Sequence, residues 1–281
     1  MYDAAKQAGI DVNMDTGYED VSFPQGKLIK RMEVIRPITQ TDGVINLCKM
    51  KTHLFMHMTG AVKNLFGIIP GLSKVGYHAK LHDKARFADM LLDLALYVSP
   101  RLSIMDAVLA MEGEGPGASG TPRHVGLLLA STDPLALDVV AGEIMGLPRE
   151  QNPVLMAAER RGLTPNRIEE VTIIGEKLSA IKIPDYKLPG TVEGLGLSGK
   201  NISFMGGFLR SALTQYPVIL KEKCIGCGVC RDSCPQKTIS ITSARKAAID
   251  QKNCIRCYCC HEMCPHKAIK IKKNHFAKLL K

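Results

Sequence analysis

The stretch C-I-G-C-G-V-C-R-D-S-C-P (Cys224–Pro235) returns 30 residues later as C-I-R-C-Y-C-C-H-E-M-C-P (Cys254–Pro265). Both read C-x2-C-x2-C-x3-C-P, and the apolar residues around them repeat as well, since Ile219 aligns with Ile249. Each half of residues 217–273 is therefore predicted to be an apolar strand, a cysteine loop that turns into a short helix, and a second apolar strand.

The cysteine spacing suits an iron–sulfur cubane, which needs four thiolates that converge on one small body. Three cysteines of each loop can wrap around it, whereas the fourth follows a helical step and points elsewhere. The segment resembles bacterial-type ferredoxins with two [4Fe–4S] clusters, where the fourth cysteine ligates the other cluster. This resemblance implies two crossed ligand sets: Cys224, Cys227, Cys230 and Cys264 for one cluster, and Cys254, Cys257, Cys260 and Cys234 for the second.

The two loops differ at two positions. Gly226 and Gly228 let the backbone approach the inorganic sulfur, but Arg256 and Tyr258 replace them in the second loop. We therefore expect the two clusters to differ in solvation and potential. Zinc sites favour two C-x2-C pairs, and disulfide frameworks belong to secreted domains, so neither alternative fits this spacing. The additional Cys259 is expected to pack beside a ligand.

The net charge of +10 comes entirely from the C-terminal part. Residues 217–281 carry 14 Lys and Arg against 4 Asp and Glu, whereas residues 1–216 carry 23 of each. A docking site for an acidic redox partner would explain this excess, and so would compensation of the charge of thiolates and clusters. A nucleic-acid contact is the less favoured interpretation.

The length of 281 residues suggests two domains. No apolar stretch reaches the length of a membrane span, and Met1–Gly9 is a polar, helix-like start rather than a signal peptide. The expected location is a reducing, low-oxygen (anaerobic) cytoplasm, where clusters held by thiolates survive. We expect no membrane span.

Before the cysteine-rich segment, strand-like and helix-like stretches alternate. Strands are predicted at 43–48, 102–108, 124–130 and 171–174, with helices at 86–98, 135–145 and 152–161. This order predicts an α/β domain at residues 1–181 with a mostly parallel sheet covered by helices on both faces. Residues 182–216 then form a linker, residues 217–273 the small α+β ferredoxin domain, and residues 274–281 a basic tail.

Four phrases of the first domain carry a further resemblance: K-M-K-T-H, T-G-A-V-K-N-L-F-G-I-I-P-G, M-E-G-E-G-P and S-T-D-P-L-A-L-D. They resemble the domain-of-unknown-function family 362, whose members often end in a two-cluster ferredoxin. Members normally begin with additional strands and helices before the equivalent of Tyr2, so the N-terminal part of the sheet is expected to be absent or supplied otherwise. The resemblance implies architecture and no established reaction.

Polar loops after the predicted strands indicate a second site, since ligands of α/β sheets bind at strand ends. His53, Lys63 and Asp106 are the catalytic candidates. Lysines bind phosphate or carboxylate, and histidine serves as acid, base or metal ligand. The candidate binding residues for a cofactor or small-molecule substrate are Lys51, Thr52, Asn64 and Glu112. His57 is one helical turn from His53 if this stretch is a helix, and Asp133 is expected to cap the helix at 135–145.

The sequence favours an iron–sulfur protein of the ferredoxin-type oxidoreductase class, whose two [4Fe–4S] clusters are expected to transfer electrons to or from a substrate or cofactor in the first domain. Two alternatives stay open. In one, the clusters are structural and hold a binding module for nucleic acid or protein. In the other, the chain is a non-redox isomerase that uses Lys63 and His53, because His53, Gly60, Lys63, Pro70 and Gly71 loosely resemble the nickel-pincer lactate racemase family.

Overall fold

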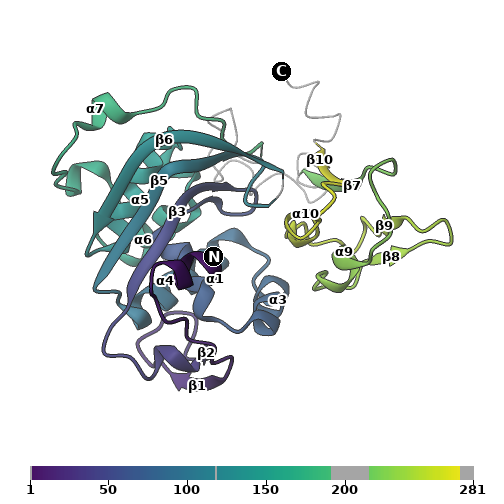
Figure 1. The fold of residues 1–281 in the computed structure, drawn as a ribbon, viewed down its shortest axis with the longest axis horizontal. Helices are drawn as coiled ribbons and strands as arrows, with labels where there is room; N and C mark the ends of the chain where they lie inside the picture. Colours follow the sequence, from purple (N-terminus) through teal and green to yellow (C-terminus); the bar gives the residue numbers. More distant parts are fainter. Residues whose placement is uncertain (1, 118, 191–214, 273–281) are drawn as a thin grey trace.

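The computed structural model describes residues 2–117, 119–190 and 215–272. A larger part of mixed α/β structure precedes a smaller cysteine-rich part (Figure 1). The strands of the larger part are β1 (Tyr18–Ser22), β2 (Arg31–Ile35), β3 (Ile45–His53), β4 (His57–Thr59), β5 (Leu102–Gly113) and β6 (Gly120–Ser131). Its α-helices are α1 (Tyr2–Gln7), α2 (Ala61–Asn64), α3 (Gly71–Lys80), α4 (Lys84–Val98), α5 (Pro134–Met145), α6 (Pro153–Arg161) and α7 (Leu178–Ile181).

The central sheet has the order β4-β3-β5-β6 and is mixed. Strand β3 pairs with β5 in parallel, whereas β3 with β4 and β5 with β6 pair antiparallel. The prediction of a mostly parallel sheet is therefore not confirmed. The reason lies in the connections: the turn between Gly113 and Gly120 is far too short for the crossover that a parallel pair requires.

Three strands, β3, β5 and β6, are longer than predicted, and the first two move several candidate site residues out of loops. Strand β3 continues through His53, and β5 continues through Gly113. Lys51, Thr52 and Glu112 therefore lie within strands. Residues 171–174, predicted as a strand, form none in the described part of the chain.

The predicted helices at 86–98, 135–145 and 152–161 are confirmed as α4, α5 and α6. The start signal expected for α5 is also present. The Asp133 side chain accepts hydrogen bonds from the backbone N–H groups of Leu135 and Ala136, which is the expected cap of α5. Gly146 closes α5 in the left-handed conformation, with φ of 65°.

Helices cover only one face of the described sheet. Met50 and Met105 point to that face and pack with Ile144 of α5. On the other face Ile45, Leu47 and Leu128 are 63%, 69% and 70% exposed. The expectation of helices on both faces is thus wrong for the residues that the structure describes. A second core lies beside the sheet, where α4 and α6 pack with the turn between β3 and β4.

The cysteine-rich part shows the predicted duplication. It contains β7 (Tyr216–Ile219), α9 (Val229–Asp232), β8 (Ile239–Ile241), β9 (Ala247–Ile249), α10 (Cys259–Glu262) and β10 (Ile269–Lys272). The two halves interlock, because β7 of the first half pairs with β10 of the second, and β8 pairs with β9. In Figure 1, α10 lies on the side that faces the larger part, with α9, β8 and β9 farther away.

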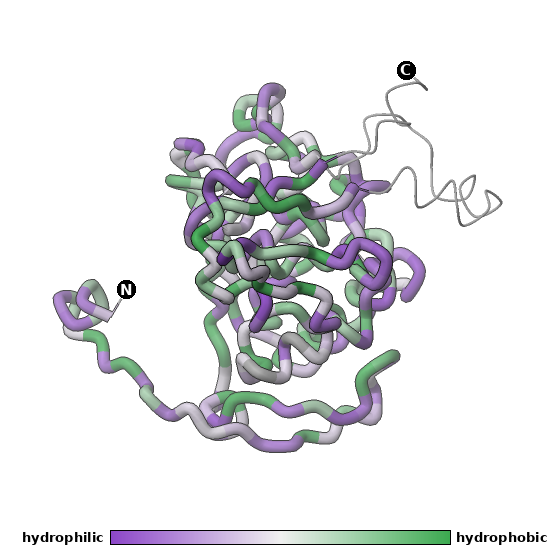
Figure 2. Tube along the Cα trace, turned by 90° about the vertical axis from the view of Figure 1, so that its right-hand side faces the viewer, coloured by the Kyte–Doolittle hydropathy of each residue, from purple (hydrophilic) through white to green (hydrophobic). Residues whose placement is uncertain are grey.

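The two ends of the larger part differ in how they lie against its body. The N-terminal segment that carries α1 projects outward (Figure 2). Residues 182–190 of the predicted linker pack onto the sheet domain, since the buried Tyr186 donates its hydroxyl to the Met111 carbonyl at 2.8 Å. The rest of that linker, residues 191–214, and the predicted basic tail at 274–281 lie outside the described residues.

Candidate functional site

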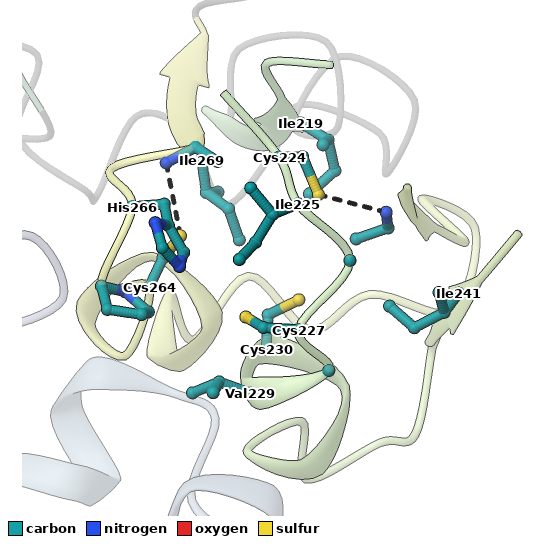
Figure 3. Close-up of a pocket in the computed structure, with 15 residues that line it drawn as sticks. Ile219, Cys224, Ile225, Cys227, Val229, Cys230, Ile241, Cys264, His266 and Ile269 are labelled. Atoms are coloured by element: carbon teal, nitrogen blue, oxygen red, sulfur yellow. Dashed lines mark hydrogen bonds between the residues drawn. The ribbon is translucent and has the colours of Figure 1, made fainter. Parts of the chain in front are cut away.

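One cavity of the cysteine-rich part is lined by Cys224, Cys227, Cys230 and Cys264, and has a volume of about 340 Å³. We call it the outer cavity. Figure 3 shows these four side chains around the same space, with Ile225 among the apolar residues beside them. Three of the four come from the first loop, and the fourth comes from the second motif.

A second cavity, of about 320 Å³, is lined by Cys234, Cys254, Cys257 and Cys260. We call it the inner cavity. Here the second loop supplies three cysteines and the first motif supplies Cys234. The crossed sets inferred from the ferredoxin resemblance are therefore the sets that surround the two cavities. Cys259 lines neither of them.

Backbone N–H groups donate hydrogen bonds to three of these sulfur atoms. The N–H of Ala247 donates to Cys224 Sγ at 3.3 Å, and the N–H of Ala268 donates to Cys264 Sγ at 3.3 Å. In the inner cavity the N–H of Thr238 donates to Cys234 Sγ at 3.4 Å. Hydrogen bonds to sulfur also tune cluster potentials. The donor sets, their apolar surroundings and these N–H groups fit a [4Fe–4S] cluster in each cavity.

Both loops need the left-handed backbone region at the same two places. Gly226 and Gly228 have φ of 70° and 84°, and the matching Arg256 and Tyr258 have φ of 58° and 63°. The second loop therefore keeps the path of the first although it has no glycine there. A left-handed conformation at two non-glycine residues costs free energy, which the packing around the second loop must offset.

All ten cysteines are free in the structure. In residues 2–117, 119–190 and 215–272, no three side chains of His, Cys, Asp or Glu are placed to hold a single metal ion. Cys48 belongs to the apolar core of the sheet domain, as its sequence context predicts.

The inner cavity lies against the sheet domain. Tyr258, which lines it, is only 4% exposed and packs into the core beside α4. His261 of α10 is buried, and its Nε2 lies 3.2 Å from the Glu114 carbonyl oxygen. Glu262, the last residue of α10, reaches His53, with 3.4 Å between Oε1 and Nε2. Helix α10 thus carries a cavity cysteine, Cys260, and a contact to the sheet domain.

Glu262 joins three of the predicted site residues in one polar cluster, which comprises Lys51, His53, Lys63 and Glu262. His53 is buried, and the positive charges of Lys63 and Lys51 act on it. Within the described residues neither lysine ammonium makes an ion pair, and Glu262 Oε1 is buried without a hydrogen bond. The cluster therefore holds charged groups whose hydrogen-bonding capacity is not used up.

Burial shifts the protonation equilibria of this cluster towards neutrality. It lowers the pKa of Lys63 to about 8, against the attraction of the Glu262 carboxylate. It raises the pKa of Glu262 to about 7, against the attraction of Lys63 and Lys51. The pKa of His53 is well below its usual value, because the ring is buried and positive charges surround it. Burial thus favours the neutral forms of Lys63, His53 and Glu262.

His53 and His57 are not a helical turn apart. They are opposite one another in the β3–β4 hairpin, and His53 Nδ1 accepts hydrogen bonds from the N–H groups of Phe55 and Met56 in its turn. This interaction leaves Nε2 directed at Glu262. His57 is held by the Gln151 carbonyl and by Lys84 Nζ, so it belongs to the support of the hairpin.

Lys63 is placed by α2, whose start is bound by a buried carboxylate. Asp138 of α5 accepts hydrogen bonds from the N–H groups of Ala61 at 2.5 Å and Val62 at 3.1 Å. Burial raises the pKa of Asp138 to about 7, and these two donors oppose that shift. The preceding Gly60 lies so close to Asp138 that a Cβ atom would overlap the carboxylate.

Two of the predicted residues are placed away from the polar cluster. Asp106 forms an ion pair with Lys49 at 2.6 Å. Asp106 is opposite Lys49 in the sheet. Because Lys49 precedes His53 by four residues of β3, this ion pair lies about 13 Å from His53 along the strand. Glu112 is buried on the other side of the sheet, where it accepts a hydrogen bond from the Lys187 N–H and faces Arg123.

The remaining two predicted residues have structural contacts. The Thr52 hydroxyl is 3.4 Å from the Met111 carbonyl oxygen. Asn64 donates to the Asn46 side chain at 2.8 Å and to the Leu47 carbonyl at 3.0 Å, which ties α2 to β3. Sequence reasoning missed Glu262, which lies within the second cysteine motif and shows no sign there of a role at the polar cluster.

No helix in the described part of the chain has the length and apolar character required to cross a membrane. The family model for the 4Fe-4S dicluster domain matches residues 223–268, so this segment is a ferredoxin-type domain that binds [4Fe–4S] clusters. A curated relative, the thylakoid-associated protein sll1697 of Synechocystis sp., is 42% identical over 159 residues. The alignment covers 53% of this chain and 49% of the relative, so the chain spans about half the length of that protein. The family model described as "Domain of unknown function (DUF362)" matches residues 1–143, which include β3, α2 and the hairpin histidines, and the chain therefore belongs to the DUF362 family.

Proposed function

We propose that this protein carries two [4Fe–4S] clusters and exchanges electrons between them and a small anionic ligand bound at the polar cluster of Lys51, His53, Lys63 and Glu262. The observation that carries the proposal is the position of α10. It contributes Cys260 to the inner cavity and Glu262 to the polar cluster, so the two sites share one helix of four residues.

The chemistry of the polar cluster favours an anion that also exchanges a proton. Two ammonium groups and an imidazole surround one carboxylate, and the lysines have no ion-pair partner within the described residues. A carboxylate or phosphate of the ligand can accept hydrogen bonds from Lys51 and Lys63. Because the pKa values of Lys63 and Glu262 lie near 8 and 7, either group can supply the proton that accompanies an electron.

Direct cluster measurements test the first half of this proposal. Anaerobically reconstituted protein is expected to hold about eight iron atoms per chain and to be reduced reversibly at a low-potential electrode. Protein that binds this iron but shows no reversible reduction would leave the clusters a structural role only.

The polar cluster is tested by comparing Lys63→Ala with Lys74→Ala, a partly buried lysine of α3 outside the polar cluster. Phosphate and small carboxylates are added as probes, and the reduction potential of the inner cluster is measured. A bound anion is expected to lower this potential in wild type and in Lys74→Ala, and to have no effect in Lys63→Ala. An equal response in all three proteins would contradict the assignment of the site.

The non-redox alternatives make different predictions. A nucleic-acid-binding module with structural clusters would bind nucleic acid with a steep salt dependence that ignores the redox state. An isomerase would turn over with its clusters oxidised throughout. The reducing, low-oxygen compartment that the sequence predicts is part of the present proposal.

A further inference from the structure

The two cluster cavities differ in what surrounds them. The inner cavity is shielded by the sheet domain, since Tyr258, Cys257 and Cys260 are all buried. A Cβ atom on Gly117 of the sheet domain would come within 2.6 Å of the Glu262 carbonyl oxygen, which shows how closely α10 lies against it. An external protein therefore has no direct approach to this cavity from that side.

The outer cavity, in contrast, opens to solvent. Cys227 is exposed, whereas the three other cysteines around this cavity are buried. Ile225, which lines the same cavity, is 55% exposed (Figure 3). Between them, Gly226 adds no side chain, and its φ of 70° lies in the left-handed region. A cluster in this cavity would have only thin protein cover on this side.

Basic residues adjoin this cavity along the chain, since Lys223 directly precedes Cys224. Lys221, Lys223 and Arg245 are exposed and form no ion pair within the described residues, and they outnumber the exposed Glu222 between the two lysines. Arg245 is next to the opening, because its backbone carbonyl lies against Gly226. We call the surface formed by Lys221, Lys223, Ile225, Cys227 and Arg245 the outer face. It has an apolar centre and a charged rim, which is the usual anatomy of a protein interface.

We infer that the outer face is the docking surface for an acidic one-electron carrier protein, which exchanges electrons with the cluster of the outer cavity. This inference rests on the proposed function, because it requires a reducible cluster there. Acidic groups of the partner are attracted by the rim, and Ile225 and Cys227 form the contact above the cluster. Interfaces of transient redox complexes are small, so a patch of this size suffices.

The electron balance is simple when the partner is a flavodoxin. Its hydroquinone gives up one electron and becomes the semiquinone, and the outer cluster is reduced by that electron. No covalent bond forms or breaks. The electron then passes to the inner cluster, which is the one beside the polar cluster. Electrons thus enter at the outer face and leave from the inner cavity towards the polar cluster. This order follows from the greater exposure of the outer cavity.

The position of the rim favours a redox protein over a polyanion. Nucleic acid and anionic membranes are bound by basic residues wherever these are spread, and they gain nothing from proximity to a cluster. Here basic residues without an ion pair among the described residues adjoin the loop that carries Cys227, the one exposed cysteine among the four of the outer cavity. A partner centred on that cysteine brings its own redox group as near as possible to the outer cluster.

The test uses the reconstituted full-length protein and a bacterial flavodoxin, an acidic protein, as the probe. Complex formation with oxidised flavodoxin is measured by calorimetry, and cluster reduction by photoreduced flavodoxin is measured by stopped flow. The double variant Lys221→Glu, Lys223→Glu and the variant Arg245→Glu are compared with wild type. The control is the double variant Lys80→Glu, Lys177→Glu, which reverses two exposed lysines of the sheet domain.

Charge reversal on the outer face is expected to slow reduction by flavodoxin by about tenfold or more at low salt and to weaken the complex by a similar factor. The control variant is expected to stay within about twofold of wild type, and added salt should remove most of the difference. Reduction by methyl viologen radical, a small cation, is expected not to slow in any variant.

Three results would overturn the inference. The first is equal behaviour of the outer-face and control variants with flavodoxin. The second is binding of wild type to vesicles of anionic phospholipid, lost in the outer-face variants, without any complex with flavodoxin. The third is failure of methyl viologen to reduce any cluster, which would overturn the proposed function as well. Normal reduction by methyl viologen with no effect of the rim would overturn the docking surface alone.

Discussion

The Glu262 carboxylate lies 3.4 Å from Nε2 of His53, although the two residues belong to different domains. Glu262 ends the helix that contains Cys260, and His53 ends strand β3. A shift of either element therefore changes both the inner cavity and the polar cluster. This relationship makes the inner cluster and the candidate ligand site one functional unit, and it can be tested by substitutions on both sides.

The crossed ligand sets predict which cysteine variants behave alike. Cys264→Ser should lose the outer cluster, as Cys227→Ser does, and Cys234→Ser should lose the inner cluster, as Cys257→Ser does. Iron should fall from about eight to about four atoms per chain in each case, and the electron paramagnetic resonance spectra should match within each pair. Cys259 lines neither cavity, so the Cys259→Ser variant should keep both clusters. A match between Cys264→Ser and Cys257→Ser would mean that each motif ligates its own cluster.

Gly226→Ala is expected to impair the outer cluster selectively. The new Cβ would overlap the Arg245 carbonyl, and the φ of 70° is strained for alanine. We expect a destabilisation of about 1–3 kcal/mol and slow loss of half the iron, measured by denaturation and by iron release to a chelator. Gly67→Ala is the matched control, since a Cβ there meets nothing within 4 Å. Equal iron release from both variants would contradict this explanation.

Asp138→Ala tests how Lys63 is held. Without the carboxylate, the buried N–H groups of Ala61 and Val62 lose their acceptor, which costs about 1–3 kcal/mol. The start of α2 should loosen, and Lys63 should react faster with an acylating reagent, as mass spectrometry can measure. Asp133→Ala removes only the cap of α5 and should cost about 1 kcal/mol without changing Lys63 reactivity. Unchanged reactivity in Asp138→Ala would show that α2 does not depend on this cap.

The lowered pKa of Lys63 has a defined consequence for stability. Because the folded-state pKa of about 8 lies below the ordinary lysine pKa of 10.5, the unfolded chain binds more protons between these pH values. Stability from this group therefore rises as pH increases from about 8 to about 10.5. Lys63→Met removes this group together with the cost of burying it. Any excess of the variant's thermal midpoint over that of wild type should therefore shrink across that window, by about 2–4 °C for each kcal/mol of stability that wild type gains. Parallel curves would contradict the shift, and Lys177→Met should follow wild type throughout.

The cysteine-rich segment was predictable because local spacing and repetition specify it. Cluster binding requires four cysteines per motif, and the repeated apolar residues beside each motif indicate the strands. The prediction of this segment therefore depends little on residues far away in the sequence. Helices α5 and α6 were predictable for the same reason: Asp133 and Gly146 mark the two ends of α5, and Asn152 marks the start of α6. Helix α4 was predictable from the apolar residues along one of its faces.

The polar cluster was only partly predictable, because it depends on how the two domains meet. The periodicity of a short apolar run such as residues 50–59 does not distinguish a helix from a strand. The tight turn after His53 contains no glycine or proline that would indicate it, because the His53 side chain itself stabilises it. Asp106 was misplaced because β5 and β6 are longer than their apolar cores. Glu262 gave no sequence signal, since its role arises from the docking of α10.

The pairing of β7 with β10 brings the entrance and the exit of the cysteine-rich part to one spot, with Ile219 opposite Ile269. A segment whose two ends are neighbours behaves as a cassette: it can be attached through a single point of a host protein without rebuilding the host's own strands. Because the two ends are neighbours, a graft of residues 216–272 onto another scaffold should bind both clusters at the same spacing as in this protein.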